Sequence, residues 1–223
     1  MALLSSYNRA VRRYHSAEVE ADLAIHLIGV LLGVIGVAVL VAVAAVAAGL
    51  PTLWSVLAYS VGLITMLVCS AAYHLQRASE RRELLRRLDH AAIFVMIAGT
   101  YTPFTVGVLD GASAFWPTSS MWVAALTGVA VKLAYPRRFE WVSILVYLVL
   151  GWAAVIFMRP LLALLDRQTL DLIVFGGVLY SIGVCIHRWH PLPFHDAIWH
   201  GLVLIAASCH YVAILHGVVM NPL

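Results

Sequence analysis

Three side chains that commonly bind metal ions stand close together near the end of the sequence. The stretch PFHDAIWHG, residues 193–201, contains His195, Asp196 and His200 and precedes a long apolar run. Asp196 and His200 are four residues apart, a spacing that puts two side chains on one face of a helix. Imidazole and carboxylate ligands suit Zn²⁺, whose catalytic sites use three protein ligands and a water. Bound zinc lowers the pKa of that water towards 7 and so provides a nucleophile.

Similar polar pairs occur at three other places in the chain. A serine one helical turn before a histidine could donate a hydrogen bond to such a water or to a developing oxyanion. A helical serine just as commonly bonds back to a carbonyl of its own helix, and a single histidine at a membrane surface is commonly half-solvated. A single pair is therefore weak evidence for a metal site. The pairs are Asp22 with His26, Ser70 with His74, and Asp89 with His90.

The composition predicts that these residues lie in a membrane protein. Hydrophobic residues make up 63% of the 223 residues and charged residues only 11%, whereas a soluble domain carries about 25% charge. From Leu23 to Gln76 there is no Asp, Glu, Lys or Arg. A helix needs about 20 apolar residues to span a bilayer, so this stretch is long enough for two spans. They are separated at GLPT, residues 49–52, where Gly and Pro interrupt a helix.

The apolar runs between charges predict an all-α integral membrane protein, a bundle of seven transmembrane helices. Residues 1–21 would form a cytoplasmic segment, and residues 22–223 a single seven-helix domain. A short amphipathic connector is expected over 161–171. The expected spans are 23–48, 53–75, 90–109, 118–135, 140–158, 170–187 and 197–218.

The basic residues predict the orientation of the bundle. Positively charged side chains favour cytoplasmic loops, and 12 of the 14 basic residues fall on one side of the predicted topology. The N-terminus is therefore expected inside and the C-terminus outside. Such a basic inner face is ordinary for membrane proteins, so membrane lipids and not nucleic acid are the expected partners.

On this topology the polar pairs converge. They open or close four helices at the inner side of the membrane, where ionisable groups usually face a bundle interior or a water-filled cavity. His74, Asp89, Asp196 and His200 come from three helices at matching depth, which favours a metal site over scattered surface residues. His187 and His190 lie in a basic loop and are interpreted as solvated.

Small residues in the apolar runs are interpreted as packing features. Glycines in the first span allow helices to approach closely, and packing within the chain is favoured over dimerisation. The cysteines show no paired spacing and are interpreted as small buried hydrophobes. The glycines are Gly29, Gly33 and Gly36, and the cysteines are Cys69, Cys185 and Cys209.

Three longer motifs resemble a known family. They are SAAYHL (residues 70–75), LDHAAIFVMIAGTYTPF (88–104) and HDAIWHGLVLIAASCHY (195–211). They are similar to the bacterial hemolysin III proteins, which belong with the progestin and adipoQ receptors and, more distantly, with alkaline ceramidases. The resemblance extends from about residue 18 to residue 216. It implies a seven-helix fold with a zinc site near the cytoplasmic face, in the cytoplasmic (inner) membrane of a bacterium.

The resemblance also implies roles for single residues. The family's Ser-x3-His motif in the second helix matches Ser70 and His74, and the aspartate that opens the third helix matches Asp89. The family's acidic, Asn and His motif before the first helix matches residues 18, 22 and 26, with aspartate at 22 where asparagine is common. The residues of that last motif are Glu18, Asp22 and His26.

The sequence departs from the family where the seventh helix begins. The family has His-x3-His there, and His200 fits the second histidine, whereas Asp196 stands in place of the first. His195, one position earlier, is turned by about 140° from His200 on a regular helix. We therefore expect Asp196 to bind the metal together with His74, His200 and Asp89. His195 is the alternative to Asp196 if the first turn is irregular.

The sequence is consistent with three functions. The resemblance to ceramidases implies a zinc-dependent hydrolase of a lipid amide or ester, in which Asp89 orients or deprotonates the water and Ser70 assists. The second candidate is a non-enzymatic membrane-homeostasis or sensor protein with a structural zinc ion. The third is the pore-forming haemolysin of the family name, which the permanently apolar character of the helices favours least.

Overall fold

A computed structural model describes residues 2–76, 80–135, 140–157 and 159–220, and the side chains of residues 16–76, 80–135, 141–153 and 161–220. Within these ranges every regular element is helical, which confirms the all-α prediction. The elements are α1 (Ala2–Ala47), α2 (Leu50–Leu75), α3 (Arg82–Val108), α4 (Gly111–Ala134), α5 (Glu140–Phe157), α6 (Arg159–Leu164), α7 (Arg167–His187), α8 (His195–Ile214) and the π-helical turn η1 (Leu215–Met220).

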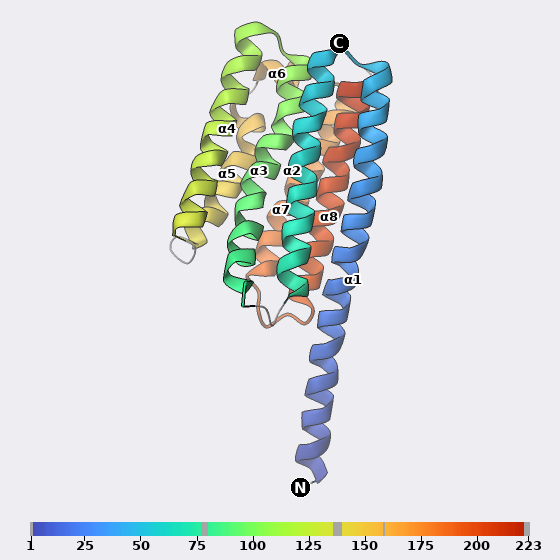
Figure 1. Cartoon of the computed structure of the whole chain (residues 1–223), viewed down its shortest axis with the longest axis vertical. Coiled ribbons are helices and arrows are strands. Elements are labelled where there is room, and N and C mark those ends of the chain that lie inside the picture. Colours follow the sequence, from blue (N-terminus) through green and yellow to red (C-terminus); the bar gives the residue numbers. More distant parts are fainter. Residues whose placement is uncertain (1, 77–79, 136–139, 158, 221–223) are drawn as a thin grey trace.

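Five helices of the described chain are long and apolar enough to cross a membrane. They are Ser16–Ala47 within α1, the whole of α2, α3 and α7, and His195–Met220, which joins α8 to η1. These five correspond to predicted spans one, two, three, six and seven. The described part of α5 contributes a shorter apolar helix, Trp141–Ala153. In Figure 1 the long helices lie alongside one another, and α4 and α5 run beside α3.

Several helices begin earlier than the apolar runs predicted. α1 begins at Ala2 and not at residue 23, and α3 begins at Arg82 and not at residue 90. The apolar run marks only the part of a helix that suits a bilayer, and Glu, Arg and Leu continue a helix readily beyond it. Residues 2–21 are therefore helical and continuous with the apolar part of α1. The predicted end of the fifth span, residue 158, lies outside the described residues.

Local sequence signals explain where two other helices begin. The break predicted at residues 49–52 is confirmed, because Gly49 is the N-cap of α2 and Pro51 lies in its first turn, where a missing N–H does no harm. The predicted connector over 161–171 contains the end of α6 and the start of α7. Asp166 caps α7 by accepting hydrogen bonds from the hydroxyl of Thr169 at 2.6 Å and its backbone N–H at 3.0 Å. These bonds lower the pKa of Asp166 below its ordinary value.

Glycines allow α2 and α3 to touch backbone to backbone. A Cβ atom on Gly62 would lie 3.0 Å from the carbonyl oxygen of Val95, and one on Gly99 would lie 3.2 Å from that of Ala58. The two glycines face each other across the crossing, so neither position has room for a side chain without movement of the backbone. This contact fixes α2, which carries His74 at its end, against α3.

The glycines of the first span pack within the chain, as the sequence predicted. Gly29 faces side chains of both α2 and α8, Gly33 faces Leu67 of α2, and Gly36 faces the ring of Tyr211 in α8. The hydroxyl of Tyr211 donates a hydrogen bond to the carbonyl of Gly36 at 2.9 Å. α1 is therefore held against α2 and α8 along its apolar length.

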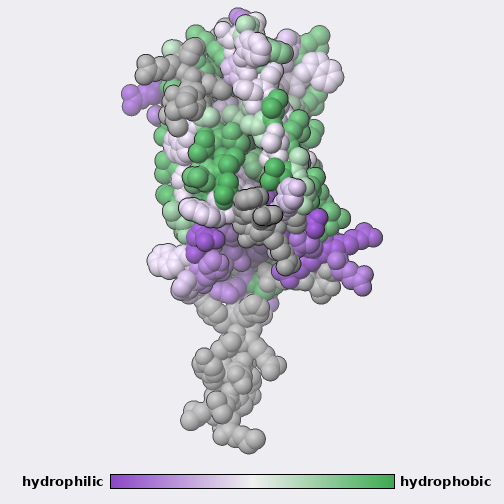
Figure 2. Space-filling model, turned by 90° about the vertical axis from the view of Figure 1, so that its left-hand side faces the viewer, coloured by the Kyte–Doolittle hydropathy of each residue, from purple (hydrophilic) through white to green (hydrophobic). Residues whose placement is uncertain are grey.

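The surface of the bundle is apolar over most of its height. Figure 2 shows a band of hydrophobic side chains across the middle of one face, with hydrophilic side chains gathered below it, towards the N-terminal end of the long axis. Large apolar side chains such as Leu31, Trp54 and Phe175 are exposed, as expected of surfaces that contact lipid. The cysteines are unpaired, but the expectation that all three are buried is wrong: Cys185 is exposed, and Cys69 and Cys209 are half-buried.

Candidate metal centre

One face of α1 carries acidic and imidazole side chains into the bundle. Glu18, Asp22 and His26 follow one another at intervals of four residues, so they lie on one side of the helix. The side chains of Asp22 and His26 are only 2% and 5% exposed. Nδ1 of His26 lies 2.8 Å from the backbone carbonyl oxygen of Asp22 and donates a hydrogen bond to it.

The carboxylate of Asp22 joins α1 to two other helices. Its Oδ2 atom lies 3.0 Å from Nδ1 of His74, in the last turn of α2. Its Oδ1 atom lies 2.6 Å from Nδ1 of His200, in the second turn of α8. Because a carboxylate only accepts hydrogen bonds, each imidazole donates through Nδ1. The side chains of His200 and His74 are 11% and 17% exposed.

The three imidazole rings form a compact cluster. The ring centroids of His26 and His74 are 4.8 Å apart and the rings are stacked. The ring of His200 stands at a steep angle to both, with centroids 4.3 Å from His26 and 4.4 Å from His74. The hydroxyl of Ser70, one turn before His74, lies 3.2 Å from Nε2 of His26.

Asp22, His26, His74 and His200, which we call the Asp–His group, could hold a metal ion. Each side chain offers one ligand atom, and these four atoms lie within 4.8 Å of one another. The four residues come from α1, α2 and α8, which are neighbours in the bundle (Figure 1). A buried carboxylate surrounded by three imidazoles is a donor set that suits a transition-metal ion better than Mg²⁺ or Ca²⁺.

The structure brings together some of the residues that the sequence selected and separates others. His74 and His200 lie in the Asp–His group, and Ser70 contacts it through His26. Asp89 is half-buried in α3 and, among the residues that the structure describes, it is not part of this group. Tyr147 of α5 donates a hydrogen bond to the carbonyl of the neighbouring His90 at 2.8 Å, which ties this end of α3 to α5.

Asp196, expected beside His74 and His200, lies outside the group. Its Oδ1 atom is 3.0 Å from Nδ1 of His195 and 3.7 Å from Nδ1 of His187. The interval of four residues does put Asp196 on the same side of α8 as His200, but about 6 Å further along the axis. At the depth of His200 the carboxylate comes from Asp22 instead. His195, the alternative ligand, is outside the group as well. His187, which was expected to be solvated, lies beside Asp196.

Asp22 and His26 are the members of the group that sequence reasoning left out of the ligand set. Both were recognised as an interval of four residues at the inner end of the first span, and both matched a family motif. The signal was therefore present in the spacing. That signal is weak, because a polar pair at the start of a span is usually half-solvated, whereas these two side chains are buried.

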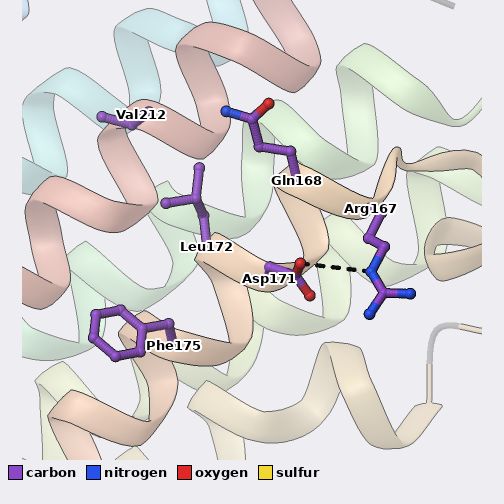
Figure 3. A pocket seen from close by; sticks show the side chains of 6 residues that line it. All are labelled: Arg167, Gln168, Asp171, Leu172, Phe175 and Val212. Carbon is purple, nitrogen blue, oxygen red and sulfur yellow. Dashed lines mark ion pairs between the residues drawn. The ribbon is translucent and has the colours of Figure 1, made fainter.

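A pocket of about 740 Å³ lies at the opposite end of α7 and α8. It is lined by apolar side chains, including Phe175 and Val212, and by the ion pair of Arg167 and Asp171 at 3.7 Å (Figure 3). Val212 follows His200 by twelve residues, which is about 18 Å along a helix. The pocket is therefore separate from the Asp–His group.

Comparisons with known proteins agree with these features. A family model described as haemolysin-III related matches residues 20–211. The chain is 36% identical over 200 residues to a hemolysin-3 homolog of Bacillus subtilis, covering 88% of this chain and 92% of the relative. It is 34% identical over 157 residues to hemolysin-3 of Bacillus cereus, covering 70% and 72%. It is 26% identical over 172 residues to the human monocyte to macrophage differentiation factor, covering 74% and 70%.

Proposed function

This chain belongs to the haemolysin-III related family of multi-pass membrane proteins, and on that premise we propose that it is a zinc-dependent hydrolase of a lipid amide or ester. The observation that carries the proposal is the Asp–His group, three imidazoles and a carboxylate within 4.8 Å of one another. Sites of this composition are used for catalysis when one position of the metal stays open.

Zinc suits this donor set better than Mg²⁺ or Ca²⁺ does. Imidazole nitrogens are typical zinc ligands, whereas Mg²⁺ and Ca²⁺ prefer sites made of oxygen atoms. The group is buried and its imidazoles are already oriented by Asp22, so few side chains would need to move to bind the ion. When bound, zinc would supply a Lewis acid that polarises a carbonyl and lowers the pKa of water.

The chain's own residues would place and stabilise the substrate carbonyl. The hydroxyl of Ser70, 3.2 Å from Nε2 of His26, is a neutral donor in contact with the group and could donate a hydrogen bond to an oxygen that gains negative charge. Asp89 remains our candidate for the residue that accepts a proton from the attacking water. Its half-buried position at the start of the apolar part of α3 is compatible with that role.

The depth of the group supports a lipid as the substrate. His74 is in the last turn of α2 and His200 in the second turn of α8, so the group lies where apolar helices meet the polar end of the bundle. In a bilayer this level is the interfacial region next to the hydrocarbon core. The amide and ester bonds of membrane lipids lie at the same level, whereas the acyl chains lie deeper.

The proposal includes the full topology of the chain. Residues 22–223 would form one seven-helix domain in the bacterial inner membrane, with α4 and α5 as the spans that complete it. Exposed aromatic side chains near the ends of these two helices, Trp116 of α4, its C-cap residue Tyr135, and Trp141 of α5, resemble the aromatic belts of transmembrane helices. The bias of basic residues supports a cytoplasmic N-terminus and an outer C-terminus.

A structural zinc site is the second candidate. The Asp–His group contains four residues that could all bind one ion, and structural zinc is normally closed by four protein ligands. Zinc would then tie α1, α2 and α8 together without catalysis. A pore-forming activity, which the names of the two Bacillus relatives suggest for those proteins, is supported by no feature of the described residues.

Metal analysis of the purified protein tests the zinc site. We expect about one zinc per chain in the wild type and a loss of zinc in His74→Ala and in His200→Ala. His216→Ala is the matched control, because His216 contacts Asp166 at the other end of the bundle. Retention of zinc in both site variants would exclude the group as the site.

Chelation distinguishes the enzyme from the structural candidate. Removal of zinc should abolish hydrolysis of a ceramide or phospholipid in mixed micelles, and addition of zinc should restore it. A structural ion would lower the temperature of unfolding when removed, without any hydrolysis by the zinc-loaded protein.

A further inference from the structure

We propose that Asp22 is a positioning residue that orients all three histidines of the Asp–His group and does not itself bind the metal. The inference rests on the proposed zinc site and specifies how that site is built. If Asp22 were a ligand, four protein ligands would close the site. If it only orients the imidazoles, three ligands remain and one position stays open for a substrate.

Asp22 contacts one nitrogen of every imidazole in the group. Its two carboxylate oxygens accept hydrogen bonds from Nδ1 of His74 at 3.0 Å and from Nδ1 of His200 at 2.6 Å. Its backbone carbonyl accepts from Nδ1 of His26 at 2.8 Å. In all three histidines, therefore, the nitrogen that carries the hydrogen is the same one.

These contacts determine which nitrogen can bind a metal. A neutral imidazole has one N–H group and one lone pair, on different nitrogens. When Nδ1 carries the hydrogen, the lone pair is on Nε2, which is then the nitrogen that binds the metal. Carboxylates and backbone carbonyls commonly fix ligating histidines in this way from outside the metal's own ligand set. A single residue of α1 does so here for ligands from three helices.

Binding through the carboxylate of Asp22 would require this arrangement to be broken. Both oxygens already accept N–H groups, and the side chain is only 2% exposed. If the oxygens turned to a metal, the N–H groups of His74 and His200 would lose their acceptor in a buried place, which is unfavourable. The observed hydrogen bonds instead put the imidazole lone pairs on Nε2, the nitrogen that would bind the metal. At His26 the ion would replace the contact of Nε2 with the Ser70 hydroxyl at 3.2 Å.

An aspartate suits this task better than an asparagine. Two N–H groups reach the side chain of Asp22 from different helices, and each needs an oxygen. An asparagine has one oxygen and an NH₂ group, and the NH₂ group would face one of the two imidazole N–H groups. Asp22→Asn should therefore leave one histidine oriented and disturb the other.

The first test requires no substitution of Asp22. In zinc-loaded, histidine-labelled wild type, long-range ¹H–¹⁵N spectra show which ring nitrogen carries the hydrogen and which binds the metal. The resonances of His74 and His200 are assigned by their absence in His74→Ala and His200→Ala. We expect a hydrogen on Nδ1 and zinc on Nε2 in both rings. Zinc on Nδ1 of either ring would overturn the proposal.

The second test compares two aspartates that lie close together. In the full-length protein, Asp22→Asn should weaken zinc binding by about 10–100-fold, the usual effect of losing an orienting partner. Asp196→Asn makes the same chemical change about one turn from His200, outside the group, and should leave the affinity unchanged. Equal affinity of Asp22→Asn and wild type would refute the role of Asp22.

The two proposals fail in different ways. If His74→Ala and His200→Ala keep their zinc, the zinc site itself is wrong. If they lose zinc while Asp22→Asn binds it as tightly as the wild type, the site stands and only the role of Asp22 is wrong. If Asp22→Asn does not fold, the spectra of the wild type still decide between the two nitrogens.

Discussion

The carboxylate of Glu18 in α1 accepts a hydrogen bond from the backbone N–H of Phe194 at 2.8 Å, although 176 positions separate the two residues. Phe194 is the N-cap of α8 and has a φ of +58°, in the left-handed region that residues other than glycine rarely adopt. α1 therefore holds the start of α8 in place one turn before it contacts His200. The face of α1 that carries Glu18 and Asp22 therefore contacts both the start of α8 and His200 within that helix.

Removing the Glu18 side chain should destabilise this end of the bundle. Glu18→Ala leaves a partly buried N–H group without its acceptor, and we expect it to reduce the free energy of unfolding by about 1–2 kcal/mol. The affinity for zinc should fall as well, because the segment that Glu18 contacts leads directly into the helical turns that carry His200. Glu18→Gln keeps an acceptor oxygen and should be milder. Thermal unfolding in detergent measures the effect.

Glu20 provides the control for this experiment. It lies two residues along α1 and is exposed, so Glu20→Ala should unfold close to the wild-type temperature. Identical unfolding of the Glu18→Ala and Glu20→Ala variants would show that the contact with Phe194 contributes nothing.

Gly62 should tolerate no side chain at the crossing of α2 and α3. A Cβ atom there would lie 3.0 Å from the carbonyl oxygen of Val95, and backbone must move to relieve the contact. We expect Gly62→Ala to reduce the free energy of unfolding by about 1–3 kcal/mol, as overpacking usually does.

Gly151 in α5 is the matched control, because a Cβ atom there would meet nothing within 4 Å. Gly151→Ala should be neutral or stabilise the helix by up to about 1 kcal/mol, since alanine is the better helix former. A larger loss for Gly151→Ala than for Gly62→Ala, measured by thermal unfolding, would contradict the close approach of α2 and α3.

The helices could be predicted from sequence because a bilayer imposes a simple requirement. A run of about 20 apolar residues without charges has few other stable forms, so α2 and α7 were placed within three residues of their observed ends. The start of α1 could not be placed, because the polar residues that precede the apolar run continue the same helix. The apolar pattern carries no signal for where such a helix begins.

The site was harder to predict than the helices. Helical spacing selected His74 and His200, which the structure places together in the Asp–His group, because both lie at the polar end of an apolar run. Spacing also suggested Asp196, but it reports only the side of a helix and not which neighbouring helix lies opposite. Asp22 provides the carboxylate beside His200 because α1 packs against α2 and α8. No local sequence pattern reports that packing.

A reporter in the segment 136–139 should be found in the cytoplasm. If α4 and α5 both cross the membrane, this segment lies on the same side as the N-terminus, as its basic residues also favour. If neither crosses, it lies outside, while the two ends of the chain stay on opposite sides in both cases. Fusions to an enzyme that is active only outside the cytoplasm measure this. Activity of the 136–139 fusion would reduce the topology to five spans.

Loss of the Ser70 hydroxyl should separate catalysis from metal binding. The hydroxyl lies beside Nε2 of His26 at 3.2 Å and is not needed to orient the imidazoles, which Asp22 contacts. Ser70→Ala should therefore keep its zinc. If the hydroxyl stabilises negative charge on the substrate oxygen, hydrolysis should fall by about 10²–10³-fold, the usual effect of removing one such donor.

Ser60→Ala is the control for that variant. Ser60 lies in the same helix, is buried, and donates its hydrogen bond to the carbonyl of Val56 at 2.8 Å, remote from the Asp–His group. It should hydrolyse lipid at the wild-type rate per zinc-loaded chain. Rates of hydrolysis by Ser70→Ala and Ser60→Ala that agree within a factor of two would show that Ser70 has no part in the chemistry. Loss of zinc from Ser70→Ala would show instead that the hydroxyl supports the metal site.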